Sequence, residues 1–488
     1  MELNTARRDR ACGVLLATAA GDALGAGYEF GPPIPAEVEV TMLGGGTFGW
    51  APGEWTDDTS MAIAIAEVAA DGVDLRTDQA QDAIVARWYA WSRTASDVGN
   101  QTRYVLGRAG RDPRGPVAAS AREASARLHQ DTGHTAGNGS LMRTAAVGLA
   151  CLDDEDGLVE AARAIGALTH FDPEAGEACV LWCLAIRHAV LTGELDVRVG
   201  LRHLDAARAD VWAERFVYAE QHSPADFTHN GWVVEALQAA WSAINCTPVP
   251  TDDPPARVYR ADHLRLALEA AVRGGRDADT VAAIAGGLLG AAYGASAVPA
   301  AWRRILHGWP DLRSRDLIAL GNKIVDRGRP DPFDPSYPGK GALDALARHP
   351  HDDQVWLGAV GTLHALPAGV DAVVSLCRIG DVPPGAEVVE VRLIDSEDPD
   401  KNPNLGFVLD DAVAAVQAFR AEGRTVLLHC VQAQSRTPTI GALYSVRTFA
   451  IAPDEALRAV SAALPSARPA EAFRRAVRAS VAADHPVR

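Results

Sequence analysis

The stretch DRGRPDPFDPSYPGKGALDALARHPHDD, residues 326–353, separates two parts of the sequence whose hydrophobic patterns differ. Its abundance of proline, glycine and aspartate is typical of an interdomain linker. Before it, segments such as 78–93 and 234–244 carry apolar residues three and four positions apart, which indicates amphipathic helices. After it come short β-rich runs at 355–360, 372–377, 387–394 and 425–430.

These patterns predict a multidomain protein. We expect an all-α domain at residues 1–325, the linker at 326–353 and a small α/β domain at 354–488. A length of 488 residues is also more than one ordinary hydrophobic core accommodates.

Composition limits the function and the compartment. The formal net charge of −17 argues against a general nucleic-acid surface, because such a surface needs a basic patch. The seven cysteines are odd in number and lack zinc-ribbon spacing, which fits the reducing cytoplasm. Residues 7–20 imitate a signal peptide, but they pass directly into candidate functional residues, so we expect no cleaved signal. No apolar stretch approaches the roughly 20 residues of a membrane span, so we expect no membrane partner.

The sequence HCVQAQSRT (429–437) lies between the predicted strand 425–428 and a helix-like stretch at 440–450. A strand, a tight loop and a helix form a backbone cradle for anions, because the loop amides converge with the positive end of the helix dipole. Cys430 is expected there as a nucleophilic thiolate, and Arg436 can hold two oxygens of a phosphoryl group. Thr437 is expected to donate a hydrogen bond to that thiolate.

This loop resembles the His-Cys-x5-Arg-Ser/Thr signature of cysteine-based protein tyrosine and dual-specificity phosphatases, over about residues 354–485. The resemblance implies a phosphorylated substrate and an aspartate that acts as general acid upstream of the cysteine. Asp398 is the first choice for that acid, and Asp395 and Asp400 are the alternatives. The family usually has glycine at the position of Ala433, and alanine tolerates positive φ less readily.

Oxygen-bearing side chains cluster in the N-terminal part of the chain. They comprise Asp22 and Glu29, then Thr56, Asp57 and Asp58, then Asp277, Asp279 and Thr280. Hard divalent cations prefer such ligands, and the absence of soft ligands favours Mg²⁺ or Mn²⁺ over zinc. The second and third groups predict a two-ion site, although Asp and Thr at these positions also suit simple helix N-caps.

Five motifs occur in a specific order: GVLLATAAGDALGAGYEF, WTDDTSMA, GNGSLMRTAAVG, THFDPEA and DADTVAAIAGGLLGA. Over about residues 8–325 the chain resembles the ADP-ribosylglycohydrolase family, the kin of dinitrogenase reductase-activating glycohydrolase. The resemblance implies an all-helical hydrolase with two Mg²⁺ or Mn²⁺ ions that cleaves the C1″ glycosidic bond of an ADP-ribosylated protein or small molecule. The implied metal ligands are Thr56, Asp57, Asp58, Asp277, Asp279 and Thr280.

The same resemblance assigns the remaining site residues. Glu29 matches a mobile glutamate beside the ions, and Asp97 matches an aspartate that some members use as base. The substrate-binding set comprises Asp22, Gly137, Asn138, Gly139 and His170. The glycines let backbone amides approach a pyrophosphate. The alternative function is an ADP-ribose or phosphate sensor whose phosphatase-like domain is inactive.

Overall fold

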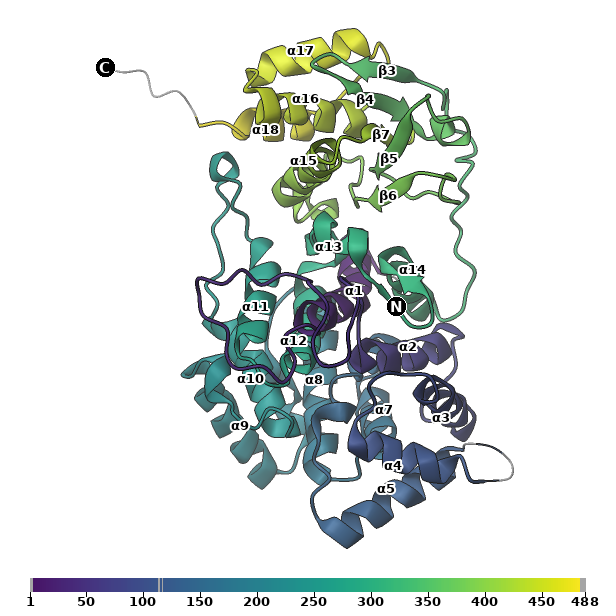
Figure 1. Cartoon of the computed structure of the whole chain (residues 1–488), viewed down its shortest axis with the longest axis vertical. Helices are drawn as coiled ribbons and strands as arrows, with labels where there is room; N and C mark the ends of the chain where they lie inside the picture. Colours follow the sequence, from purple (N-terminus) through teal and green to yellow (C-terminus); the bar gives the residue numbers. More distant parts are fainter. Residues whose placement is uncertain (1–2, 113–114, 116, 483–488) are drawn as a thin grey trace. The chain divides into compact units, whose positions relative to one another are not determined.

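The computed structural model describes residues 3–112, 115 and 117–482. The chain forms two compact units, which Figure 1 draws with their helices and strands labelled. Unit 1 consists of Met1–Pro248, His263–Val298 and Ile305–Asp331. Unit 2 consists of Val249–Asp262, Pro299–Arg304 and Pro332–Arg488.

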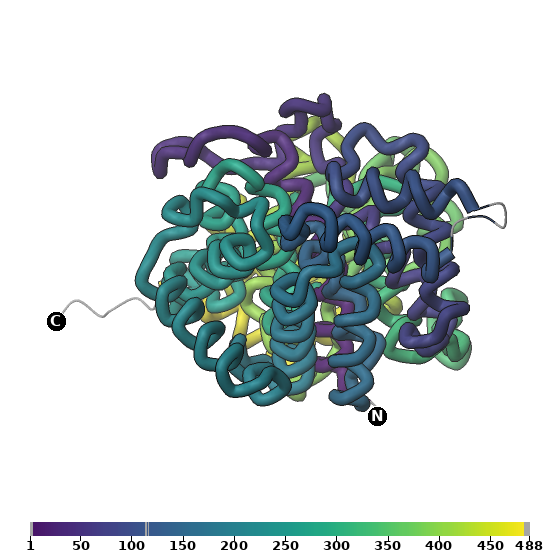
Figure 2. Tube along the Cα trace, turned by 90° about the horizontal axis from the view of Figure 1, so that it is seen from below, coloured from purple at the N-terminus to yellow at the C-terminus, as the bar shows by residue number. Residues whose placement is uncertain are grey.

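Unit 1 is almost wholly helical, as expected, and Figure 2 shows its helices side by side. Its longer helices are α1 (Thr5–Gly25), α2 (Asp57–Ala70), α3 (Asp78–Ser92), α4 (Asn100–Ala109), α5 (Ala118–Thr132), α6 (Ala145–Ala150), α7 (Glu155–Ala167), α8 (Pro173–Thr192), α9 (Ala206–Glu220), α10 (Val233–Cys246), α11 (Asp262–Arg273), α12 (Ala278–Tyr293) and α14 (Ser314–Asp326). A small hairpin pairs β1 (His307–Gly308) with β2 (Leu312–Arg313).

The centre of unit 1 is the contact between α1 and α12, which is built from small residues on both helices. A Cβ at Gly21 would overlap the carbonyl of Ala282, and one at Gly25 would overlap the backbone of Asp279. Farther along the pair, a Cβ at Gly290 would overlap the carbonyl of Gly13. The two backbones therefore approach more closely than any larger side chain allows.

Helix α8 corrects one expectation from the sequence. Its span Pro173–Thr192 is long and apolar enough to cross a membrane by length and composition alone. However, 72% of its most apolar 18-residue window is buried inside the structure, which is the behaviour of a core helix.

Unit 2 contains a five-stranded sheet in the order β3-β4-β7-β5-β6. The strands are β3 (Leu346–His349), β4 (Asp352–Ala359), β5 (Val370–Ser375), β6 (Glu387–Glu390) and β7 (Thr425–Cys430), and only the β3–β4 pair is antiparallel. The helices are α13 (Ala300–Ile305), α15 (Leu405–Ala421), α16 (Arg436–Phe449), α17 (Pro453–Ala463) and α18 (Glu471–Ala479). This is the expected small α/β architecture, and its central strand β7 ends at Cys430.

The boundaries of unit 2 differ from those expected from composition. Strand β3 lies within the segment predicted as linker, and Tyr337 of that segment packs on a core cluster that includes Cys377. Within unit 2, Arg303 pairs with Asp411 at 2.8 Å, and both side chains are nearly buried. Proline and aspartate content identifies loops, whereas contacts between distant segments decide which core a loop joins.

We predict that Gly21→Ala destabilises unit 1 by about 1–3 kcal/mol, because the added methyl group must push α1 away from the backbone of α12. Gly107→Ala in α4 is the matched control, since a Cβ there has nothing within 4 Å. The control should be neutral or stabilising by about 0.5–1 kcal/mol. Denaturant unfolding followed by circular dichroism measures both, and equal stability of the two variants would contradict the packing argument.

Candidate functional site

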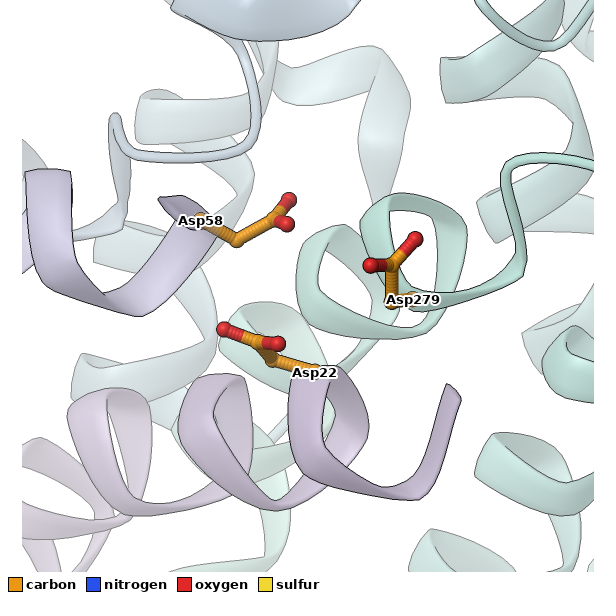
Figure 3. A group of neighbouring side chains, drawn as sticks. All are labelled: Asp22, Asp58 and Asp279. Atoms are coloured by element: carbon orange, nitrogen blue, oxygen red, sulfur yellow. The ribbon is translucent and has the colours of Figure 1, made fainter. Parts of the chain in front are cut away.

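Three helix ends in unit 1 bring carboxylates together. Asp22 comes from the last turn of α1, Asp58 from the first turn of α2 and Asp279 from the first turn of α12. Figure 3 shows these three side chains converging, and one oxygen of each lies within 4.8 Å of the others. Glu29, Asp277 and Asp279 form a second group that meets the same criterion. Asp279 is therefore shared by both groups.

Asp22 has a structural task that the sequence did not reveal. Its two carboxylate oxygens accept hydrogen bonds from the backbone amides of Thr56 and Thr59, at 2.9 and 3.0 Å. These amides belong to the start of α2, whose first donors lack partners within the helix. Asp22 thus caps α2 from a different helix and holds the Thr-Asp-Asp motif against α1, whereas the sequence assigned it to substrate binding.

Other predicted ligands meet around this centre. The Thr56 hydroxyl lies 3.1 Å from Asp58 Oδ2 and 3.5 Å from Asp279 Oδ2. Thr280 is buried one residue after Asp279. Asp58 Oδ1 and Glu29 Oε2 are buried without a hydrogen-bond partner among the described residues. Buried carboxylate oxygens without donors suit a cation, because such atoms are otherwise costly to desolvate.

Crowding and burial make this an unusual set of acids. Burial, followed by the charges of Asp277, Asp97, Asp57 and Asp22, raises the pKa of Glu29 to about 9. Burial also raises the pKa values of Asp57, Asp58 and Asp279 well above their ordinary range, and neighbouring carboxylates add to this. The pKa of Asp97 is raised by burial and then by Asp277. A divalent ion would reverse these effects, so the donor set fits Mg²⁺ or Mn²⁺.

The Gly137–Gly139 loop adjoins the acidic cluster. The amide of Asn138 donates to Asp277 Oδ2 at 2.8 Å and to the carbonyl of Asn230 at 2.9 Å. Asn138 therefore orients a predicted metal ligand, which differs from the substrate contact that we expected. A Cβ at Gly137 or Gly139 would lie 3.3 or 3.0 Å from the ring of His170, so the structure brings these three predicted residues together.

A cavity of about 480 Å³ opens beside this loop. Its lining residues are Gly133, His134, Ala136, Gly137, Asp172, Glu174, Gly231 and Trp232. Gly231 also faces the acids, since a Cβ there would lie 3.8 Å from Asp277 Oδ2. Sequence reasoning missed Trp232 and its neighbours, because they join the site through the bridge between Gly137 and Trp232.

In unit 2 the loop that follows β7 places Cys430 at the carboxyl end of the central strand, nearly fully buried. Ala433 has φ of 53°, the left-handed conformation for which we expected glycine. Arg436 Nη1 donates to the carbonyls of Leu376 and Leu393 at 2.6 and 3.0 Å. Its Nε is buried without a hydrogen-bond partner among the described residues.

Three further residues of unit 2 have roles that were predicted from the sequence: Thr437, Asp398 and Asp395. The Thr437 hydroxyl donates to the carbonyl of Gly358 at 3.3 Å, so its bond is made to strand β4. Asp398 caps a short 3₁₀ turn by accepting from the amide of Asp400 at 3.0 Å. Asp395, one of the alternatives for the general acid, lies 4.0 Å from Arg436 Nε.

Comparisons with known proteins agree with the geometry of unit 1. Residues 3–332 match the family model of the ADP-ribosylglycohydrolases. The ADP-ribosylarginine hydrolase Tri1 of Pseudomonas putida is 31% identical over 327 residues, 65% of this chain and 78% of that protein. The ADP-ribosyl-[dinitrogen reductase] glycohydrolase of Rhodospirillum rubrum is 29% identical over 60% of this chain and 89% of its own length.

Two solved structures are similar to parts of this chain. A structure described as an ADP-ribosylglycohydrolase-related protein complex aligns at TM-score 0.50 with 30% identity, covering 67% of this chain and 100% of that chain. Human DUSP28 aligns at TM-score 0.25 with 23% identity, covering 28% of this chain and 94% of its own. Because this TM-score is too low to support a function, the function of unit 2 has to be inferred from the geometry of its own loop.

We predict that Mg²⁺ raises the thermal midpoint of unit 1, because a cation relieves the repulsion between the carboxylates. At a Mg²⁺ concentration of about 100 times the dissociation constant, binding should increase the free energy of unfolding by about 2.7 kcal/mol. Asp279→Asn should abolish most of this gain, since Asp279 belongs to both groups. Asp131→Asn, at an exposed position of α5, is the control and should behave as wild type. A gain that persists in Asp279→Asn would place the ion elsewhere.

Proposed function

The chain belongs to the ADP-ribosylglycohydrolase family, and we propose that unit 1 hydrolyses the C1″ glycosidic bond of ADP-ribosylated substrates with the help of Mg²⁺ or Mn²⁺. The observation that carries the proposal is the convergence of carboxylates from the ends of α1, α2 and α12. Because the similar Tri1 protein is named an ADP-ribosylarginine hydrolase, an arginine linkage is the substrate class that we propose.

The residues of the site fall into metal ligands, residues that orient these ligands, and candidate general bases. Thr56, Asp57, Asp58, Asp277, Asp279 and Thr280 would hold the ions, with Asn138 and Asp22 orienting Asp277 and the start of α2. When bound, such ions polarise water and orient ribose hydroxyls. Glu29 or Asp97 accepts the proton of the attacking water, since both residues are partly exposed and the charge of Asp277 acts on both carboxylates. The cavity beside Trp232 gives the rest of the ADP-ribosyl group a place next to the cluster.

A second activity is favoured by the loop in unit 2. We propose that Cys430 attacks a phosphoryl group held by the loop amides and by Arg436, whose buried Nε still has a hydrogen bond to donate. Asp395 is now the better candidate for the acid that protonates the leaving oxygen, because Asp398 is engaged as a cap. If turnover is absent, the loop is a phosphate-binding site within a sensor.

We predict that Glu29→Gln lowers the kcat for release of ADP-ribose from an ADP-ribosylated arginine peptide by about 100-fold or more. A base acts only in the transition state, so the affinity for ADP-ribose should change little. Asp97→Asn, assayed in parallel, identifies which of the two carboxylates is the base. Full activity of both variants would contradict the proposed proton acceptor, and activity that resists a chelator would contradict the metal.

We predict that Ala433→Gly increases turnover of an aryl phosphate several-fold, because glycine adopts the observed φ without strain. Cys430→Ser should abolish this turnover and leave ADP-ribose release unchanged. Asp395→Asn should slow an alkyl phosphate more than an activated aryl phosphate, whose leaving group needs a proton less. If Asp398→Asn shows that selectivity instead, the sequence-based choice of acid is correct.

A further inference from the structure

Arg143 is a fully buried cation. Among the residues that the structure describes, no carboxylate lies within 4.0 Å of its guanidinium, although the charge of Asp57 acts on it from farther away. The guanidinium carbon instead lies 3.9 Å from the ring centroid of Trp88, and Nη1 lies 3.7 Å from the sulfur of Met61. Burying a charge in such surroundings is costly. The guanidinium makes one further hydrogen bond, through Nη2.

Arg143 Nη2 donates to the hydroxyl oxygen of Thr169 at 2.6 Å. The same hydroxyl lies 2.7 Å from Nδ1 of His170. A guanidinium has donors only, so the Thr169 oxygen must accept from Arg143. The hydroxyl proton of Thr169 then points to His170 Nδ1, because this is the acceptor that the described residues offer it. A nitrogen that accepts carries no proton, which places the proton of the neutral ring on Nε2.

The Nε2 edge of the ring faces the candidate site. A Cβ built on Gly137 would lie 3.3 Å from Nε2, and one on Gly139 would lie 3.2 Å from it. No described residue accepts a hydrogen bond from Nε2, and Gly137 also lines the cavity beside Trp232. Glycine at both positions keeps this N–H group from being covered by a neighbouring side chain.

We propose that Arg143 and Thr169 are positioning residues that hold His170 as the neutral tautomer protonated at Nε2, so that the ring donates a hydrogen bond to an oxygen of a ligand at the Gly137–Gly139 loop. The identity of that ligand, an ADP-ribosyl group, rests on the proposed function. Burial and the neighbouring Arg143 charge lower the pKa of His170 well below its usual value, so the ring stays neutral. His170 is thereby a fixed donor, unable to accept at Nε2.

The test uses the full chain with Mg²⁺ and selectively ¹⁵N-labelled histidine. Long-range proton–nitrogen spectra report the tautomer, and the resonances of His170 are assigned by their loss in His170→Gln. Wild type and Thr169→Ser should show the Nε2-protonated ring, whereas Thr169→Val should populate the other tautomer. ADP-ribose affinity should fall about tenfold in Thr169→Val, the size of one hydrogen bond, and stay near wild type in Thr169→Ser.

A double-mutant cycle separates positioning from a general effect on folding. In His170→Gln the side chain has no tautomer to set, so adding Thr169→Val should cost little further affinity. An equal loss in both backgrounds would overturn the proposal, and so would a wild-type ring protonated at Nδ1. If the ring is protonated at Nε2 but ADP-ribose does not bind, the role of Arg143 and Thr169 in setting the tautomer is supported and the proposed ligand is wrong.

Discussion

The close backbone contact between α1 and α12 is the constraint on which the site in unit 1 depends. Gly25 lies against the backbone of Asp279, at the point where the last turn of α1 meets the first turn of α12. This contact brings carboxylate oxygens of Asp22 and Asp279 within 4.8 Å of each other. A side chain at Gly25 would separate the helices and with them the two halves of the cluster. The small residues of α1 are therefore part of the chemistry of the site.

The same arrangement is unfavourable for the protein alone. Buried carboxylates repel one another and lose hydration, as the raised pKa values of Asp57, Asp58 and Asp279 reflect. The fold offsets part of this through donors that surround the acids. The amides at the start of α2 satisfy Asp22, and Asn138 satisfies one oxygen of Asp277. The oxygens that remain without donors are the ones for which a cation is the suitable partner.

Unit 2 contains a comparable local strain at Ala433. Ala433 adopts φ of 53° and is fully buried in the loop between Cys430 and Arg436. The loop is held from outside, since Ser466 donates to the carbonyl of Ala433 and Val360 donates to that of Val431. Such contacts can maintain an unfavourable conformation that local preference alone would reject.

The sequence by itself determined the two fold classes and the membership of each oxygen-bearing cluster. Helical and strand periodicities are local, and the Thr-Asp-Asp and Asp-x-Asp-Thr motifs lie within single helix starts. Tertiary structure alone decided which clusters meet and what each member does. Asp22 became a cap for α2, Asn138 became a support for Asp277, and Thr169 became a link between Arg143 and His170. A hydrogen bond depends on the positions of two groups in space, and those positions are set here by helices that are distant in the chain.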